Sequence, residues 1–242
     1  MAVRRLVVAL GFLTRLPVPR IEADAADFVA GVRLYPIAGL VIGGLVAGAG
    51  WAGAQADPWL GAVAALVAWV WVTGALHLDG LGDLADGLGA AHGDRTRLLA
   101  VMADPHTGSF GVVAIVLQLA AKLVALHLLL PSGWMALVAI PAAARLGPLW
   151  WAWRLPSLKS TGLGAAISGA VRPRDLVGWG LLLAGGCAVV PILLAAPVLL
   201  LVLGAWFRNR VGGMTGDVHG AGIELVEAGL LLVAALLHAQ GG

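Results

Sequence analysis

The stretch GSFGVVAIVLQLAAKLVALHLLL, residues 108–130, is a mostly apolar run that contains one charged side chain, Lys122. A helix that crosses the hydrocarbon core of a bilayer needs about 20 mostly apolar residues. This stretch is long enough, so it predicts a transmembrane helix. Other stretches predict the same: 31–53, 58–78, 134–153 and 221–239.

The composition agrees with a membrane protein throughout. Of the 242 residues, 60% are hydrophobic and 12% are charged, more apolar than the surface of a soluble domain allows. The single cysteine, Cys187, excludes an intramolecular disulfide, and a net charge of +2 argues against a nucleic-acid partner. We therefore expect one all-α, polytopic membrane domain spanning residues 1–242, a helical bundle with membrane lipid around it.

The region 176–207 is too long for one crossing and contains Pro191 and Pro197, which break helices. It is expected to cross twice or to re-enter, bending near Val190-Pro191. Residues 6–16 are expected to form a retained interfacial helix rather than a cleaved signal peptide, because Arg15 interrupts the apolar run. The total is about seven crossings plus this N-terminal helix.

Basic residues mark one side of the membrane. Most of them occur in the segments 4–20, 95–97, 154–174 and 208–210, whereas the connectors 54–57 and 131–133 contain none. Cytoplasmic loops carry an excess of Lys and Arg, so the N-terminus is predicted inside and the C-terminus outside.

The acidic residues gather in two windows, 79–104 and 217–227, which together contain eight of the 13. On a helix, Asp79, Asp83 and Asp86 lie at i, i+4 and i+7 and share one face, where a cation would relieve their repulsion. Oxygen ligands without cysteine favour Mg²⁺ or Mn²⁺. His77 is a ligand, a proton carrier or a polar interface residue, and the alternative for the whole segment is a solvated acidic loop.

Two further segments supply candidates. Asp104 precedes the stretch quoted above and either caps its helix or binds metal, and the backbone at Gly108 is open to a phosphate. Around Thr215 and Gly216 the chain is glycine-rich ahead of a helix and presents N–H groups to anions. Asp217 is a ligand or an N-cap.

Lys122 and Arg145 lie inside predicted spans. Either pairs with a carboxylate of the acidic windows or contacts a substrate phosphate, although for Arg145 a snorkelling position at the interface is an equal alternative.

Carboxylates for a divalent cation, glycine-rich turns and nearby bases are what phosphoryl transfer requires. Asp83-x-x-Asp86-Gly87 resembles the opening of the CDP-alcohol phosphotransferase motif, but the rest of that motif is absent. A secondary transporter is the alternative of another class. Against it, the acids gather at the predicted cytoplasmic ends of the spans, and no two halves of the chain look alike.

Four ordered segments, 12–19, 77–87, 102–111 and 215–217, resemble the cobalamin-5'-phosphate synthase (adenosylcobinamide-GDP ribazoletransferase) family. The resemblance implies a Mg²⁺-dependent multi-pass enzyme of the bacterial cytoplasmic membrane, with its active site facing the cytosol, in late cobalamin biosynthesis. It implies transfer of the adenosylcobinamide phosphoryl group from adenosylcobinamide-GDP to α-ribazole or α-ribazole 5'-phosphate, with release of GMP.

Applied to this chain, the resemblance assigns metal binding to five aspartates and leaves the general base open between a carboxylate and His77. The oligomeric state is also open, a homo-oligomer included. The five aspartates are Asp79, Asp83, Asp86, Asp104 and Asp217.

Overall fold

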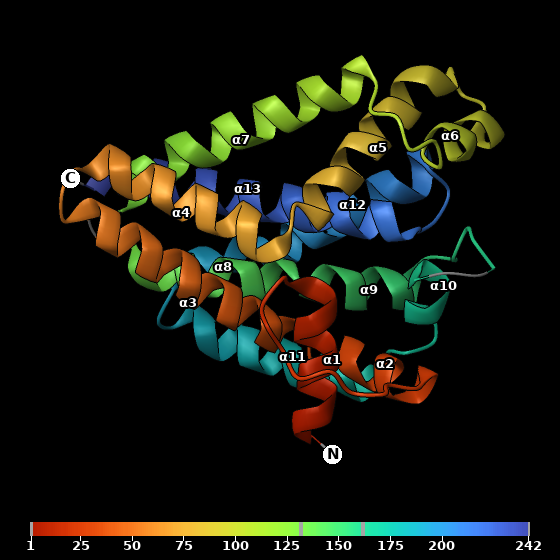
Figure 1. The fold of residues 1–242 in the computed structure, drawn as a ribbon, viewed down its shortest axis with the longest axis horizontal. Coiled ribbons are helices and arrows are strands. Elements are labelled where there is room, and N and C mark those ends of the chain that lie inside the picture. Colours follow the sequence, from red (N-terminus) through yellow and green to blue (C-terminus); the bar gives the residue numbers. More distant parts are fainter. Residues whose placement is uncertain (1, 131–132, 161–162, 242) are drawn as a thin grey trace.

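A computed structural model describes residues 2–130, 133–160 and 163–241, and over these it is an all-α bundle (Figure 1). The fold class predicted from the apolar stretches is confirmed. The elements are α1 (Ala2–Leu13), α2 (Ala25–Val32), α3 (Tyr35–Ala54), α4 (Pro58–Thr73), α5 (Leu76–Ala91), α6 (Arg95–Val101), α7 (Ser109–Leu129), α8 (Trp134–Ala144), α9 (Leu146–Arg154), α10 (Leu163–Ile167), α11 (Pro173–Cys187), the 3-10 helix η1 (Pro191–Leu194), α12 (Ala195–Arg210) and α13 (Gly216–Gly241).

Among the described residues, five helical segments are long and apolar enough to cross a membrane, or six if α4 and α5 count as one bent span. The predicted total of about seven is therefore too high. The five segments are Tyr35–Ala54, Ser109–Leu129, Trp134–Arg154, Pro191–Arg210 and Gly216–His238.

One reason for the lower count is a break in the predicted span 58–78. Gly74 and Ala75 both adopt left-handed backbone conformations, with φ of 59° and 58°. The helices on either side, α4 and α5, meet at 84°. A side chain at Gly74 would collide with Arg15, whose backbone N–H donates to the Val72 carbonyl at 2.7 Å. The bend directs α5, with its aspartates, toward α6 (Figure 1).

The other reason lies in 176–207. α11 has only 15 residues, and none of them is buried. α11 ends at Cys187 and η1 begins at Pro191, so the predicted interruption near Val190-Pro191 is confirmed. η1 and α12 together, Pro191–Arg210, are long and apolar enough to cross, whereas α11 is too short to do so alone.

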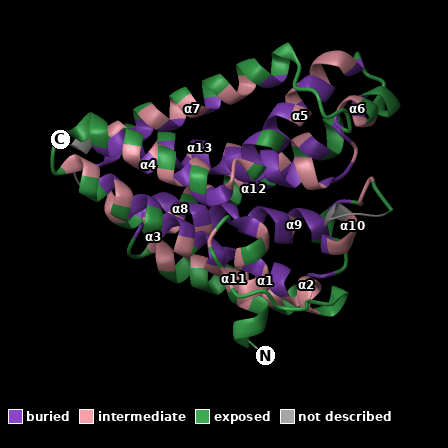
Figure 2. Cartoon of the chain, viewed as in Figure 1, coloured by how far each residue is buried: buried purple, intermediate pink, exposed green. Residues whose placement is uncertain are grey.

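Burial differs strongly between the helices (Figure 2). α8, α9 and α13 form the buried centre, whereas α7 exposes Phe110, Val113, Val116 and Leu117 on its outer face. Apolar side chains this exposed on a long helix are expected to face lipid.

The N-terminal helix, α1, occupies residues 2–13 instead of the predicted 6–16. It ends where the Thr14 hydroxyl donates to the Leu10 carbonyl at 2.6 Å. Its buried residues, Ala9 and Leu13, pack in a second core cluster with Tyr35 of α3 and Leu149 of α9.

The two ends of the bundle differ in their loops. One end gathers α2, α6, α10 and the start of α13, and the other holds the α3–α4 turn and the C-terminus (Figure 1). The connector 92–94, the loop 155–160 and residues 211–215 all belong to the first end, which we call the polar end.

Candidate active site

α5 carries the aspartates of the first acidic window, and its glycines hold it against its neighbours. A Cβ atom at Gly80 would lie 2.6 Å from the Asp217 carbonyl oxygen, so only glycine permits this approach to α13. Gly82 likewise faces Ile115 of α7, and Gly87 faces Met102. These glycines therefore serve helix packing and bring α5 beside Asp217.

Asp217 lies in the first turn of α13, whose start is anchored to the loop 155–160. The Thr215 hydroxyl accepts the Val218 N–H at 3.2 Å, so Thr215 caps this helix. Two backbone hydrogen bonds join Met214 to the loop, one with Pro156 and one with Leu158, each of 2.9 Å. The loop in turn places the Lys159 Nζ 3.6 Å from the Asp217 carboxylate.

The resulting charge is unbalanced. The half-buried Asp83 carboxylate is repelled by Asp79, Asp217 and Asp86, and among the described residues Lys159 supplies the positive charge that opposes this repulsion. Four carboxylates with one lysine leave an excess negative charge. A site of this kind attracts a cation.

Asp86 differs from the other aspartates of α5. Its carboxylate accepts the backbone N–H of Gly108 at 2.7 Å and that of Gly111 at 2.9 Å. It thereby satisfies the N-terminus of α7, where negative charge is stabilised. Seven residues of helix also separate Asp79 from Asp86 by roughly 10 Å along the axis, and both Asp86 oxygens already accept backbone N–H groups of α7.

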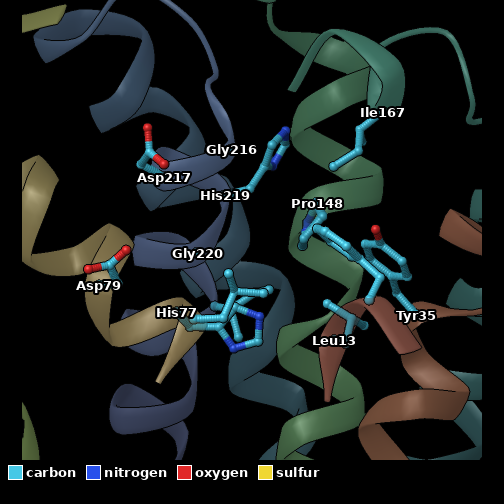
Figure 3. Close-up of a pocket in the computed structure, with 13 residues that line it drawn as sticks. Leu13, Tyr35, His77, Asp79, Pro148, Ile167, Gly216, Asp217, His219 and Gly220 are labelled. Carbon is cyan, nitrogen blue, oxygen red and sulfur yellow. The ribbon is translucent and has the colours of Figure 1, made fainter. Parts of the chain in front are cut away.

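A cavity of about 560 Å³, part of it open to solvent, lies beside this acidic cluster. Asp79 and Asp217 line it together with His77, Gly216 and His219 (Figure 3). Its other lining residues are mostly apolar: Phe12, Leu13, Tyr35, Leu76, Pro148, Ile167, Gly220 and Ile223.

Three buried polar side chains of this cavity have no hydrogen-bond partner within the described part of the chain. They are the Tyr35 hydroxyl and both ring nitrogens of His77 and of His219. Buried polar groups are normally hydrogen-bonded, so groups left unsatisfied around a cavity indicate a binding site for a partly polar ligand.

One of the two predictions for Asp104, that it caps α7, is wrong, because the N-cap of this helix is Gly108. The Asp104 carboxylate turns back on its own exposed loop and accepts the His106 N–H at 2.9 Å. This hydrogen bond and the contact with the His106 ring, at 2.6 Å, hold the pKa of Asp104 below its usual value. Its role as a metal ligand stays a prediction.

Lys122 and Arg145 realise the first of the two alternatives predicted for them, pairing with carboxylates. The Lys122 Nζ lies 2.7 Å from both Glu224 and Glu227, and Arg145 Nη1 lies 2.8 Å from Glu227. All four side chains are buried. Arg145 is therefore no snorkelling residue, and a contact of either cation with substrate phosphate stays a prediction.

The donor chemistry fits a hard divalent cation, because the crowded groups are carboxylates and no thiol lies among them. Across the described ranges, no three Asp, Glu, His or Cys side chains are already arranged around one metal position. Binding would thus have to draw the Asp79, Asp83 and Asp217 side chains together, which their partial exposure permits.

Sequence reasoning missed three residues of this site: Lys159, Tyr35 and His219. Lys159 was visible only as one base of a loop whose charges the positive-inside pattern already explains. Tyr35 is the only tyrosine of the chain and begins a span, a signal that was available. His219 follows the Thr215–Asp217 segment by two residues, and no pattern in the sequence indicated a role for it.

Comparison with known proteins supports a specific assignment. The profile of the cobalamin-5-phosphate synthase family matches residues 5–235. The chain is 56% identical to the adenosylcobinamide-GDP ribazoletransferase of Novosphingobium aromaticivorans, over 96% of both chains. It is 50% identical to that of Thiobacillus denitrificans, over 96% of this chain and 94% of the relative.

A more distant relative, the adenosylcobinamide-GDP ribazoletransferase of Pseudomonas aeruginosa, is 41% identical over 97% of this chain and 99% of its own. No solved structure is significantly similar to the chain. The chain that carries this acidic cluster and cavity therefore belongs to the cobalamin-5-phosphate synthase family.

Proposed function

We propose that this protein is the adenosylcobinamide-GDP ribazoletransferase of a bacterial cobalamin pathway, with its active site at the acidic cluster and the adjoining cavity. One observation carries the location: Asp79 of α5 and Asp217 of α13 meet at a cavity whose buried polar groups lack partners. Family membership supports the activity and speaks against the lipid-synthase and transporter alternatives.

In the proposed reaction, a hydroxyl oxygen of α-ribazole or its 5'-phosphate attacks the phosphorus next to cobinamide. The bond from that phosphorus to the oxygen of the GMP group breaks, and GMP leaves. The mostly apolar cavity holds the aromatic base of the acceptor, and the Tyr35 hydroxyl and His219 ring hydrogen-bond its polar atoms.

The acceptor's proton goes to a carboxylate oxygen of Asp79 in this scheme. His77 is less suited, because burial opposes a positive charge on its ring, as do Arg145 and Lys122, and Glu227 offsets this only in part. A neutral His77 instead orients the acceptor by hydrogen bonding.

Asp79, Asp83 and Asp217 would hold Mg²⁺, which when bound neutralises the pyrophosphate oxygens and so stabilises the leaving group. Lys159 offsets part of the cluster's negative charge and faces the same phosphates. Gly216 and the Thr215 cap fix Asp217. Asp86 positions the α5–α7 junction through Gly108, while Lys122 and Arg145 fix α13 from within the bundle.

The polar end is proposed to face the cytosol from a bacterial inner membrane. It contains Arg95, Lys159 and Arg208, whereas the opposite α3–α4 turn has no Lys or Arg. Nucleotide substrates are available on that side.

The decisive experiment is a product assay on the purified protein in detergent, with adenosylcobinamide-GDP and α-ribazole, with Mg²⁺ and with EDTA. We expect GMP and the cobamide in equal amounts, dependent on Mg²⁺. CMP release from a CDP-alcohol substrate, or no turnover without a sealed compartment, would contradict the proposal.

A further inference from the structure

A second cavity, of about 1380 Å³ of space largely open to the surface, lies between α1, α2 and α11. It shares no lining residue with the acidic cavity. We call it the arginine cavity, because its walls carry four arginines and one acidic residue: Arg5, Arg33, Arg172, Arg174 and Asp175.

Arg33 is fixed at the back of the arginine cavity. Its Nε donates to the Ala170 carbonyl at 2.7 Å and lies 3.2 Å from the Asp175 carboxylate. The Trp179 indole N–H donates to the Arg33 carbonyl at 2.9 Å. The cavity is thus built on a tied junction between α2 and α11.

The arginines lie close enough to act on one another. Burial lowers the pKa of Arg33, and the neighbouring Arg172 lowers it further; Asp175 opposes this shift, while Arg174 and Arg5 add to it. Guanidinium groups gathered in this way favour a bound anion, and phosphate oxygens match their geometry.

Asp175 alone does not balance these charges. Within the described residues, Arg5, Arg172 and Arg174 form no ion pair, whereas the adjacent Arg4 pairs with Asp27 at 2.7 Å. Four arginines and one aspartate leave an excess of three positive charges around the cavity.

The arginine cavity continues into an apolar groove. Trp179 and Leu182 line both the arginine cavity and a groove of about 690 Å³ between α3, α8 and α11. Beside it, Val177 and Leu181 of α11 are 62% and 70% exposed. The two spaces together have a cationic head and an apolar tail.

We propose that the arginine cavity binds the phosphate of an anionic phospholipid whose acyl chain lies in the groove along α11. Basic pockets between helices at the cytoplasmic surface recognise such headgroups. A soluble phosphate compound would leave the apolar groove unfilled. Arginines placed only by the positive-inside pattern would attract anionic lipid equally at every basic loop, so removing arginines from the cavity or from the end of α12 would weaken the preference alike.

The test is native mass spectrometry of the full protein released from mixed micelles with equal phosphatidylglycerol and phosphatidylcholine. We expect the wild type to retain phosphatidylglycerol about tenfold over phosphatidylcholine. The variant Arg172→Gln/Arg174→Gln should lose the preference, and the matched control Arg208→Gln/Arg210→Gln at the end of α12 should keep it.

The milder Arg174→Gln, which changes one exposed and unpaired side chain, should weaken the preference even if the double variant fails to fold. Equal retention of both lipids by the wild type would overturn the proposal. So would an unchanged preference in a folded double variant, or displacement of the lipid by millimolar glycerol 3-phosphate.

Discussion

Two groups of charged residues in this protein differ in balance and burial. The buried group, Lys122, Arg145, Glu224 and Glu227, has two cations and two anions within 2.8 Å of their partners. The acidic cluster at the polar end has four aspartates and one lysine, and most of it reaches solvent. The buried charges neutralise one another and need no further partner, whereas the excess negative charge of the exposed cluster favours binding of a cation.

The largest expected effect is on activity at the unbalanced cluster. Asp79→Asn and Asp83→Asn each remove a proposed cation ligand, and Asp79→Asn also removes the proposed base. We expect GMP release to fall about 1,000-fold, with the thermal unfolding midpoint of each variant near the wild-type value.

Full activity of either variant at low Mg²⁺ would contradict the assignment of that aspartate as a metal ligand. Asp94→Asn serves as the matched control, because this exposed aspartate only caps α6 by accepting the Thr96 N–H at 2.8 Å.

The next effect belongs to the balanced cluster and concerns stability. Glu227→Gln leaves Lys122 and Arg145 buried with one carboxylate between them. We expect the free energy of unfolding to fall by about 3–5 kcal/mol, measured by denaturation in detergent.

A double variant separates charge balance from substrate binding. Lys122→Met/Glu224→Gln removes one cation and one anion and should be more stable than Lys122→Met alone. If instead Glu227→Gln and Lys122→Met kept wild-type stability and raised the KM for adenosylcobinamide-GDP, the predicted contact with substrate phosphate would gain support.

Asp86 lies in the acidic window of the sequence, but its contacts in the structure stabilise the junction of α5 and α7. Asp86→Asn puts an NH₂ group against one of the N–H donors of Gly108 and Gly111. We expect a loss of about 1.5–3 kcal/mol in the free energy of unfolding. The Mg²⁺ concentration for half-maximal activity should not change; an increase would instead identify Asp86 as a metal ligand.

The sequence predicted those parts of the molecule that follow from local pattern. Apolar run length predicted the spans around α3 and α7, and Pro191 predicted the bend before η1. The break at Gly74-Ala75 was not predicted, because it depends on the side chain of Arg15, distant in sequence, packing against Gly74. The roles of Asp86 and Lys159 escaped too, since helical spacing shows which face a residue shares and not which helix end or loop lies opposite.

The smallest expected effect tests whether Asp104 belongs to the unbalanced cluster. Its carboxylate accepts the His106 N–H and contacts the His106 ring in an exposed turn, and these contacts lower the pKa of Asp104. Asparagine also forms such turns. We therefore expect Asp104→Asn to change GMP release by no more than about twofold, as for most surface substitutions. Titration of activity with Mg²⁺ decides the question, because a lost ligand raises the Mg²⁺ requirement, whereas a lost turn contact leaves it unchanged.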